Sequence, residues 1–185
     1  DARGADYLTR MQDAASRMRS LIDDLLSLSR LSSTPHEPAQ VPLGSLLSQV
    51  LLDLETLLEE TGAVVVHGEL PTVLGDRSLL RRLFQSLISN AVKFQPTQQS
   101  AHISISSRPA ALPREGNEIW VEDNGIGIAP EFAGRIFEPF QRLHGRTEYP
   151  GTGIGLAIGQ TVAERHGGSL TLDTSFTGGS RFVLF

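Results

Sequence analysis

Apolar and small residues recur at alternating intervals of three and four along the first part of the chain. The pattern covers residues 6–32 and consists of Leu8, Met11, Ala15, Met18, Ile22, Leu25 and Ser29. Such a heptad seam predicts one long helix. Leu21, Leu26 and Leu28 widen the apolar stripe, which favours a bundle of several helices over a two-stranded rod. A lone helix cannot bury this stripe, so we expect partner helices from a dimer or from a neighbouring segment.

Three prolines then interrupt the helical pattern. Pro35, Pro38 and Pro42 each fix φ and remove a backbone donor. They predict a helical segment at residues 1–34, a linker at residues 35–42 and a separate domain at residues 43–185.

Helical and alternating patterns follow each other irregularly in residues 43–185. Helices are expected at residues 43–61, 77–94 and 155–166, and strands at residues 63–67, 72–74, 101–108, 117–122, 169–173 and 180–185. Gly62 is suited to end the first helix and Asp76 to begin the second. Because the order lacks a regular β-α-β period, we expect an α+β fold, a two-layer α/β sandwich with helices on one face of the sheet.

Composition excludes several classes of protein. The 185 residues include no cysteine, which rules out a disulfide-stabilised miniprotein, a thiolate nucleophile and cysteine-type zinc sites. The formal net charge of -5, with no basic stripe, argues against a nucleic-acid binder. No stretch approaches the roughly 20 apolar residues of a membrane span, and the first residues lack the layout of a signal peptide. We therefore expect a cytoplasmic protein with no membrane segment in this chain.

Glycine is concentrated in the C-terminal part, since thirteen of the eighteen glycines follow position 115. Glycine serves where the backbone needs special dihedral angles or must approach a ligand closely. Four of these glycines, Gly167, Gly168, Gly178 and Gly179, are expected to make turns only. Lys93 is the single lysine, although a preference for arginine codons also explains that scarcity.

Two polar patterns can carry chemistry, and each has a simpler structural explanation. Ser86, Asn90 and Lys93 form a polar line along one side of the helix at residues 77–94. Taken alone, this line is best explained as a solvated face, but an amide oxygen also suits magnesium and a lysine also suits phosphate. Asp123, followed by Asn-Gly-Ile-Gly-Ile, fits a plain turn and fits equally well a carboxylate that accepts a hydrogen bond from a ligand amino group.

A third pattern, Gly-Thr-Gly-Ile-Gly-Leu at residues 151–156, opens a helix. Free backbone N–H groups and the helix dipole make such a start an anion site. The Walker-type loop does not fit because no Gly-Lys-Ser/Thr follows, and the dinucleotide fingerprint fails because no strand directly precedes the glycines. The order of Asn90, Asp123, a long lid and this helix favours a nucleotide site.

In that order, the patterns resemble the four boxes of sensor histidine kinases. Residues 83–94 (Leu-Phe-Gln-Ser-Leu-Ile-Ser-Asn-Ala-Val-Lys-Phe) resemble the N box, residues 123–128 the first G box, residues 136–140 (Ile-Phe-Glu-Pro-Phe) the F box and residues 151–156 the second G box. Residues 15–30 resemble the second helix of the dimerization and histidine-phosphotransfer domain, and with residues 137–158 they are most similar to phytochrome-type kinases. The resemblance implies a Bergerat-type ATP-binding fold with a mixed sheet, preceded by one long bundle helix.

The resemblance also implies a role for individual residues at the two ends of ATP. Asn90 would coordinate Mg2+ on the phosphates, Lys93 would face phosphate, and Asp123, supported by Ser180, would bind the adenine amino group. The glycines that would admit the base are Gly125 and Gly127.

A lid at residues 134–150 would cover the nucleotide, with Phe137 and Phe140 as its anchors. The other residues that the resemblance places at ATP are Arg142, His144, Tyr149, Gly151, Thr152, Gly153, Gly155 and Leu156. Phosphoryl transfer asks mainly for positioning and charge neutralisation, which this set supplies.

Partners follow from the same resemblance. The complete protein would transfer the γ-phosphoryl group of ATP to a histidine and then to a response-regulator aspartate. It would form a homodimer through the N-terminal helix, and a light-sensing, bilin-binding module would lie upstream of this chain.

Two departures from the family pattern leave other functions open. No phosphoaccepting motif of the His-Glu/Asp-Leu-Arg type occurs, and His36 lies among prolines, so the chain is expected to begin after the acceptor helix and to bind ATP without labelling itself. Ser86 replaces an asparagine of the N box, and it also stands where ATP-driven clamps of the wider superfamily carry a water-activating glutamate, which disfavours a fast ATP hydrolase. The alternatives are a nucleotide-binding module of a response-regulator phosphatase and a degenerate dimerization module.

Overall fold

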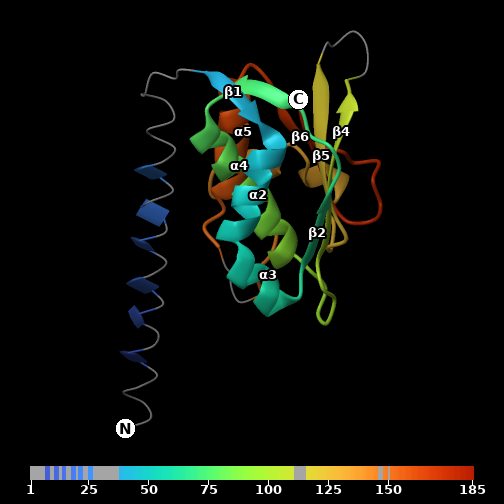
Figure 1. Cartoon of the computed structure of the whole chain (residues 1–185). Helices are drawn as coiled ribbons and strands as arrows, with labels where there is room; N and C mark the ends of the chain where they lie inside the picture. The colour runs from blue at the N-terminus through green and yellow to red at the C-terminus, as the bar shows by residue number, and fades with distance from the viewer. Residues whose placement is uncertain are drawn as a thin grey trace.

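The computed structural model describes residues 38–110, 116–145, 148–149 and 151–185 (Figure 1). It also describes twelve residues of the N-terminal segment: 7–8, 11–12, 14–15, 18–19, 21–22 and 25–26. All twelve are helical, as the heptad pattern predicts, and the rest of the expected helix lies outside the described residues. In the described part of the chain, no helix combines the length and apolar character that crossing a bilayer requires.

A five-stranded mixed sheet forms one layer of the domain, in the order β2-β4-β5-β7-β6. Its strands are β2 (Val64–His67), β4 (His102–Pro109), β5 (Asn117–Asp123), β6 (Leu170–Leu172) and β7 (Arg181–Leu184). Only the pairing of β2 with β4 is parallel. Alternate residues of β5 point into the core, which places Ile119, Val121 and Asp123 on the same buried side.

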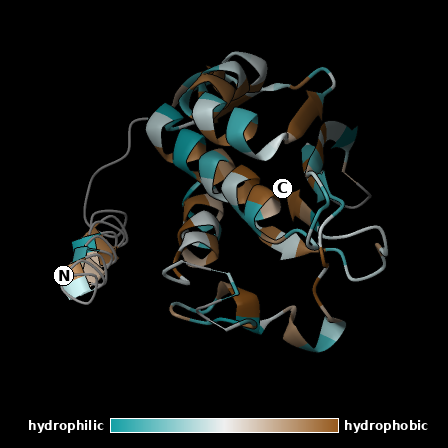
Figure 2. Cartoon of the chain, turned by 90° about the horizontal axis from the view of Figure 1, so that it is seen from below, coloured by the Kyte–Doolittle hydropathy of each residue, from teal (hydrophilic) through white to brown (hydrophobic). Residues whose placement is uncertain are grey.

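Four helices cover one face of this sheet (Figure 1). They are α2 (Leu43–Asp53), α3 (Glu55–Thr61), α4 (Arg77–Lys93) and α5 (Gly155–Arg165). Figure 2 shows how hydrophobic and hydrophilic residues alternate around these helices, as an amphipathic covering layer requires. The predicted α+β class and the two-layer sandwich are therefore confirmed.

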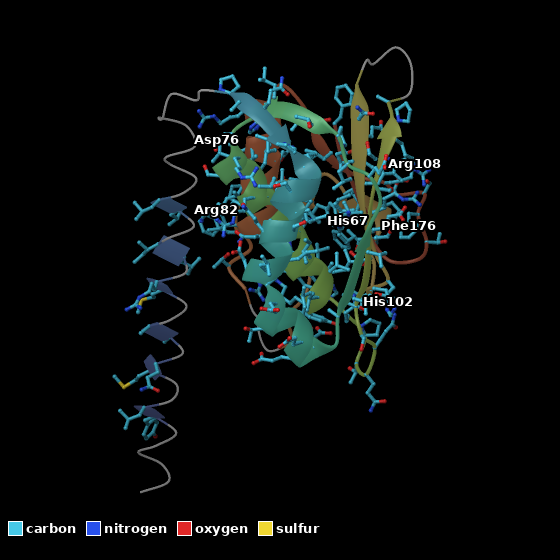
Figure 3. The ribbon with its side chains drawn as sticks, viewed as in Figure 1. His67, Asp76, Arg82, His102, Arg108 and Phe176 are labelled. Atoms are coloured by element: carbon cyan, nitrogen blue, oxygen red, sulfur yellow. The ribbon has the colours of Figure 1, made fainter. Side chains whose placement is uncertain are left out.

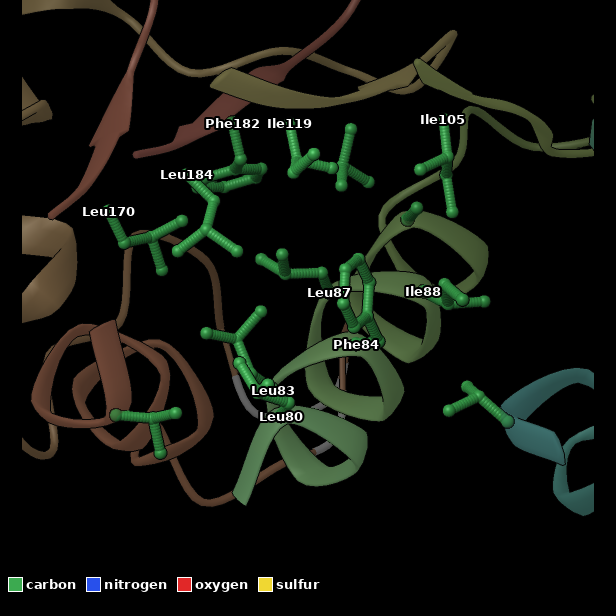
Figure 4. Packing of buried hydrophobic residues seen from close by; sticks show 14 of the residues in the cluster. Leu80, Leu83, Phe84, Leu87, Ile88, Ile105, Ile119, Leu170, Phe182 and Leu184 are labelled. Atoms are coloured by element: carbon green, nitrogen blue, oxygen red, sulfur yellow. The ribbon is translucent and has the colours of Figure 1, made fainter. Parts of the chain in front are cut away.

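Helix α4 provides the centre of the core. Its buried side chains include Leu83 and Phe84, neither of which has measurable exposure, and they face Ile119, Phe182 and Leu184 of the sheet (Figure 4). Asp76 caps the helix as predicted, because its Oδ1 accepts hydrogen bonds from the N–H groups of residues 78 and 79. A helix fixed in this way holds the polar residues of its last two turns in a defined place.

The expected linker at residues 35–42 requires a correction. Residues 39–42 form strand β1 (Ala39–Pro42), which pairs antiparallel with β3 (Thr72–Gly75) in a separate two-stranded sheet. Val41 buries its side chain to 1% exposure, which favours this pairing over a solvated linker. Pro42 is tolerated because it stands at the end of a strand that has only one neighbour. Residues 35–37 lie outside the described residues.

The sheet face opposite the helices carries a stack of charged and aromatic side chains. The guanidinium groups of Arg108 and Arg181 lie 4.0 and 4.4 Å from the ring centre of Trp120. Arg181 also donates to Glu122 at 2.6 Å and to Asp173 at 2.8 Å. Arg108 and Phe176 project from this side of the sheet, away from the helices (Figure 3). The charged side chains of this outer face therefore bind one another and the Trp120 ring.

Candidate functional site

A cavity of about 210 Å3 opens between the end of α4, the end of β5 and the start of α5. Thirteen of the fourteen residues expected to bind the nucleotide line it. They are Asn90, Lys93, Asp123, Gly127, Arg142, His144, Tyr149, Gly151, Thr152, Gly153, Gly155, Leu156 and Ser180. The fold therefore brings together residues from five separate stretches of the sequence, and only Gly125 stands outside the lining.

Asp123 lies at one end of the cavity, at the last position of β5, and is 9% exposed. Its Oδ1 accepts hydrogen bonds from the N–H groups of Gly125 at 2.8 Å and Ser180 at 3.0 Å. Burial raises the pKa of this carboxyl, while the hydrogen bonds from Ser180 and Gly125 act in the opposite direction. The side chain is thus fixed as a hydrogen-bond acceptor on the floor of the cavity.

Two glycines allow the chain to pack around Asp123. A Cβ at Gly125 would run into the carbonyl oxygen of Phe94, so the turn after β5 can pack against the end of α4 only with glycine there. Gly179 has φ +146°, and a Cβ there would run into the carbonyl oxygen of Asp123. The expectation that Gly179 makes only a turn is therefore wrong. Its place directly before Ser180, already expected beside Asp123, was the available signal.

The start of α5 forms the opposite end of the cavity. Gly153 has φ +76°, and a Cβ there would lie 3.0 Å from the carbonyl oxygen of Gln141. At Gly155, the first residue of α5, a Cβ would lie 2.6 Å from Oγ of Ser86. The N–H groups of a first helical turn attract anions, and Asn90 and Lys93 line the same cavity as this helix start.

Lys93 stands between an aromatic ring and this glycine loop. Its Nζ lies 4.1 Å from the ring centre of Phe94, and a Cβ at Gly151 would lie 2.9 Å from it. Burial, together with the charge of Arg142, lowers the pKa of Lys93 to about 8. A bound anion near this amine would stabilise its charged form.

Residues 141–144 and 149 of the expected lid line the cavity. The guanidinium of Arg142 donates hydrogen bonds to the carbonyl oxygens of Gly145 at 3.4 Å, Tyr149 at 2.7 Å and Gly151. The Tyr149 hydroxyl donates to the carbonyl oxygen of Gln95 at 3.1 Å. Arg142, expected at the nucleotide, therefore also donates to backbone carbonyl groups of the lid and of the glycine loop that follows it.

Residues 75–185 match the family described as "Histidine kinase-, DNA gyrase B-, and HSP90-like ATPase". This match covers more than half of the chain. The chain belongs to this ATPase family. The predicted resemblance to sensor histidine kinases is also confirmed by the relatives and solved structures that share its sequence and fold.

Two of these relatives are phytochromes. Cyanobacterial phytochrome A of Nostoc sp. (strain PCC 7120) is 37% identical over 185 aligned residues, covering 98% of this chain and 23% of that protein. Phytochrome-like protein Cph1 of Synechocystis sp. (strain PCC 6803) is 35% identical, covering 98% of this chain and 24% of that protein. The chain thus spans about a quarter of the length of these two phytochromes.

The crystal structure of full-length ShkA in complex with AMPPNP has the same fold. It superimposes with a TM-score of 0.76 at 27% identity, covering 99% of this chain and 38% of that chain. The catalytic domain of histidine kinase ThkA, at 23% identity and a TM-score of 0.63, supports the fold alone.

The two expected lid anchors of this ATPase domain differ in their surroundings. Phe137 is 8% exposed and packs edge-on against Phe182, with 6.4 Å between the ring centres. The ring of Phe140 is 54% exposed, and its residue is held through the backbone, whose N–H donates to the carbonyl oxygen of Gly153 at 3.0 Å. Only Phe137 has the burial that a side-chain anchor needs.

Sequence reasoning missed Phe94 as part of the cavity wall. Its ring forms a triangle with His144 and Tyr149, with centres 5.1 to 6.1 Å apart, and all three line the cavity. The available signal was its position directly after Lys93, at the end of α4. The remaining missed lining residues are apolar or neutral: Ile126, Ile128, Ile136, Gln141, Leu143 and Phe182.

Metal binding at this site would depend on a bound nucleotide, whose phosphates would supply ligands to the ion. Among the described residues, no group of three or more His, Cys, Asp or Glu side chains is placed to hold a metal ion. Asn90 does reach the cavity from α4, so its amide oxygen fits a Mg2+ ion whose other ligands are phosphate oxygens and water. Ser86 lies outside this cavity, in a neighbouring groove with Gln85, Ser89 and Gly155.

Proposed function

We propose that this domain is the ATP-binding catalytic part of a phytochrome-type sensor histidine kinase. The observation that carries the proposal is a single cavity with a buried carboxylate at one end and a glycine-rich helix start at the other. Its substrate is Mg-ATP, and its product is a phosphohistidine whose phosphoryl group passes to a response-regulator aspartate. Because ATP and response regulators are found there, the same proposal places the protein in the cytoplasm.

Each end of the cavity has a distinct task in this proposal. The Asp123 carboxylate accepts a hydrogen bond from the adenine amino group, a contact that guanine, with an oxygen at that position, cannot make. The N–H groups at the start of α5 and the Lys93 ammonium bind the phosphates, and Asn90 supplies an oxygen ligand to Mg2+. Positioning and charge neutralisation are what phosphoryl transfer requires.

Water is not the acceptor in this proposal. A general base for ATP hydrolysis would have to stand near the phosphate end, but Ser86 packs against Gly155 at that point, and a serine is not basic. The acceptor histidine comes from elsewhere, because the four histidines of the described part lie on strands, in the lid or at the end of α5. A response-regulator phosphatase and a degenerate module are the competing functions.

Transfer to a separate acceptor tests the proposal. We expect phosphohistidine when the chain is mixed with a dimerization and histidine-phosphotransfer domain, Mg2+ and γ-labelled ATP, and none when the acceptor histidine is replaced by glutamine. Absence of label, together with dephosphorylation of a pre-labelled response regulator, would favour the phosphatase.

The Lys93 amine predicts that ATP binding takes up a proton. The pKa of Lys93 is about 8 in the nucleotide-free chain, and bound phosphate raises it because phosphate favours the charged amine. The affinity for ATP is therefore greatest below about pH 8 and falls as the pH rises above it. Calorimetry above about pH 8, in two buffers of different ionisation enthalpy, is expected to show uptake of close to one proton. Lys93→Met is expected to bind more weakly and without proton uptake. Equal uptake in both proteins would contradict this role.

The N-terminal helix predicts a dimer. Its described residues expose seven large apolar or aromatic side chains: Tyr7, Leu8, Met11, Met18, Ile22, Leu25 and Leu26. We expect a dimer in analytical ultracentrifugation that the double variant Met18→Glu/Ile22→Glu shifts to monomer, because a buried carboxylate opposes helix packing. The matched double variant Ser16→Glu/Ser20→Glu, which adds the same two carboxylates at positions off the apolar stripe of the heptad pattern, should keep the dimer. A monomeric parent chain would reject this prediction.

A further inference from the structure

Asn124 follows Asp123 directly, and its side chain ties the turn after β5 to the chain that leads into β4. Its Oδ1 accepts a hydrogen bond at 2.7 Å from the N–H of His102, which lies at the start of β4 (Figure 3). Its Nδ2 donates to the carbonyl oxygen of Ser100 at 3.2 Å. Because one partner is a backbone donor and the other a backbone acceptor, only this orientation of the amide satisfies both.

The Asn124 side chain takes the place of a backbone group at the end of the β4–β5 ladder. Ile103 is paired with Asp123, so His102 and Asn124 would form the next pair. The His102 N–H binds the side-chain oxygen of Asn124, and the backbone carbonyl oxygen of Asn124 accepts from Nε2 of Gln99 at 2.9 Å. A side chain that replaces the backbone in this way lets the chain leave a strand and begin a turn.

The turn that begins at Asn124 holds the carboxylate of the cavity. The N–H of Gly125, the next residue, donates to Oδ1 of Asp123 at 2.8 Å. The N–H of Ile126 donates to the carbonyl oxygen of Phe94 at 3.0 Å, which ties the far side of the turn to the end of α4. The direction of the Gly125 N–H, and with it that of the carboxylate, therefore depends on where the chain leaves β5.

We propose that Asn124 is a positioning residue for base recognition, which acts through Asp123. Its amide fixes the turn that holds the carboxylate against the adenine amino group. Asn124 does not line the cavity, so its effect on base selection has to pass through its neighbour. This inference rests on the proposed function, because it concerns the same nucleotide site.

Comparison of Mg-ATP with Mg-ITP by isothermal calorimetry isolates this contact. Hypoxanthine carries an oxygen where adenine carries the amino group, and the phosphates of the two nucleotides are the same. We expect Asn124→Ala to lower the affinity for ATP about 10-fold and to leave the affinity for ITP unchanged. The Ser180 N–H still binds Oδ1 of Asp123, so the loss should be smaller than that caused by removal of the carboxylate itself.

Two further variants show whether Asn124 acts through Asp123. The double variant Asp123→Asn/Asn124→Ala should have the same ratio of ATP to ITP affinity as Asp123→Asn alone. Asn117→Ala is the matched control, because it makes the same substitution at the exposed opposite end of β5, and it should leave both affinities unchanged.

A thermal melt of each variant shows whether it folds. If Asn124→Ala does not fold, Gln99→Ala keeps the inference testable, because it removes only the hydrogen bond to the Asn124 carbonyl oxygen. Gln99→Ala should lower the ratio of ATP to ITP affinity by at least about 2-fold.

An equal loss of affinity for ATP and ITP in Asn124→Ala would overturn the inference, since a residue that serves only the fold would weaken both nucleotides alike. An effect of Asn124→Ala on the ratio that persists beside Asp123→Asn would overturn it as well. The unaltered chain separates this inference from the proposed function. If that chain prefers ATP and Asn124→Ala keeps the preference, only the positioning role fails. If the unaltered chain binds neither nucleotide, the proposed function fails and this inference with it.

Discussion

Asp123→Asn is expected to lower the affinity for Mg-AMPPNP about 100-fold or more, without unfolding the domain. The N–H groups of Gly125 and Ser180 both donate to Oδ1, so they will hold the amide oxygen of asparagine in the same place. The amide nitrogen must then point into the cavity, where a donor faces the donor of the adenine amino group. Burial already raises the pKa of Asp123, so loss of the charge should not destabilise the folded state.

Isothermal calorimetry and a thermal melt together check this expectation. Glu131→Gln is a suitable control, because it removes one carboxylate from an exposed position outside the cavity. The control should bind like the parent chain. Unchanged affinity of Asp123→Asn would show that the base does not contact this carboxylate, whereas a large drop in melting temperature would show that the residue serves the fold.

Gly179→Ala is expected to destabilise the domain by about 3 kcal/mol or more. The residue has φ +146°, which side chains rarely adopt, and its Cβ would meet the backbone oxygen of Asp123, which cannot move without disturbing β5. Urea unfolding measures the change in the free energy of unfolding.

Gly134→Ala provides the matched control for this variant. Gly134 has a negative φ of -78°, and no atom lies within 4 Å of a Cβ built there, so alanine should be neutral or slightly stabilising. A loss below about 1 kcal/mol at Gly179 would contradict the packing described for the base end of the cavity.

The elements that carry the site could be predicted from sequence because they follow local rules, whereas the roles of the individual residues came from the family resemblance. Asp76 starts α4 as an N-cap, and the helical period then places Asn90 and Lys93 on one side of its last turns. Asp123 ends a strand whose alternation is visible in the sequence, and the glycines of residues 151–155 open a helix. Each of these features depends on neighbours a few residues away.

The features that sequence reasoning missed depend on distant partners. Strand β1 exists because residues 39–42 pair with β3, thirty or more residues later, and no local signal outweighs Pro38 directly before the strand and Pro42 at its end. Gly179 reveals its role only when it touches the backbone of Asp123. The same holds for Phe140, whose ring stays exposed although its F-box position suggested an anchor. Tertiary contact, and not local preference, decides these cases.

Titration of the unaltered chain with Mg-ATP and Mg-GTP tests the central claim most directly. If Asp123 reads the base amino group while α5 and Lys93 hold the phosphates, ATP should bind at least about 100-fold more tightly than GTP. Equal affinity for the two nucleotides, or no binding of either, would contradict the assignment of this cavity as an adenine nucleotide site.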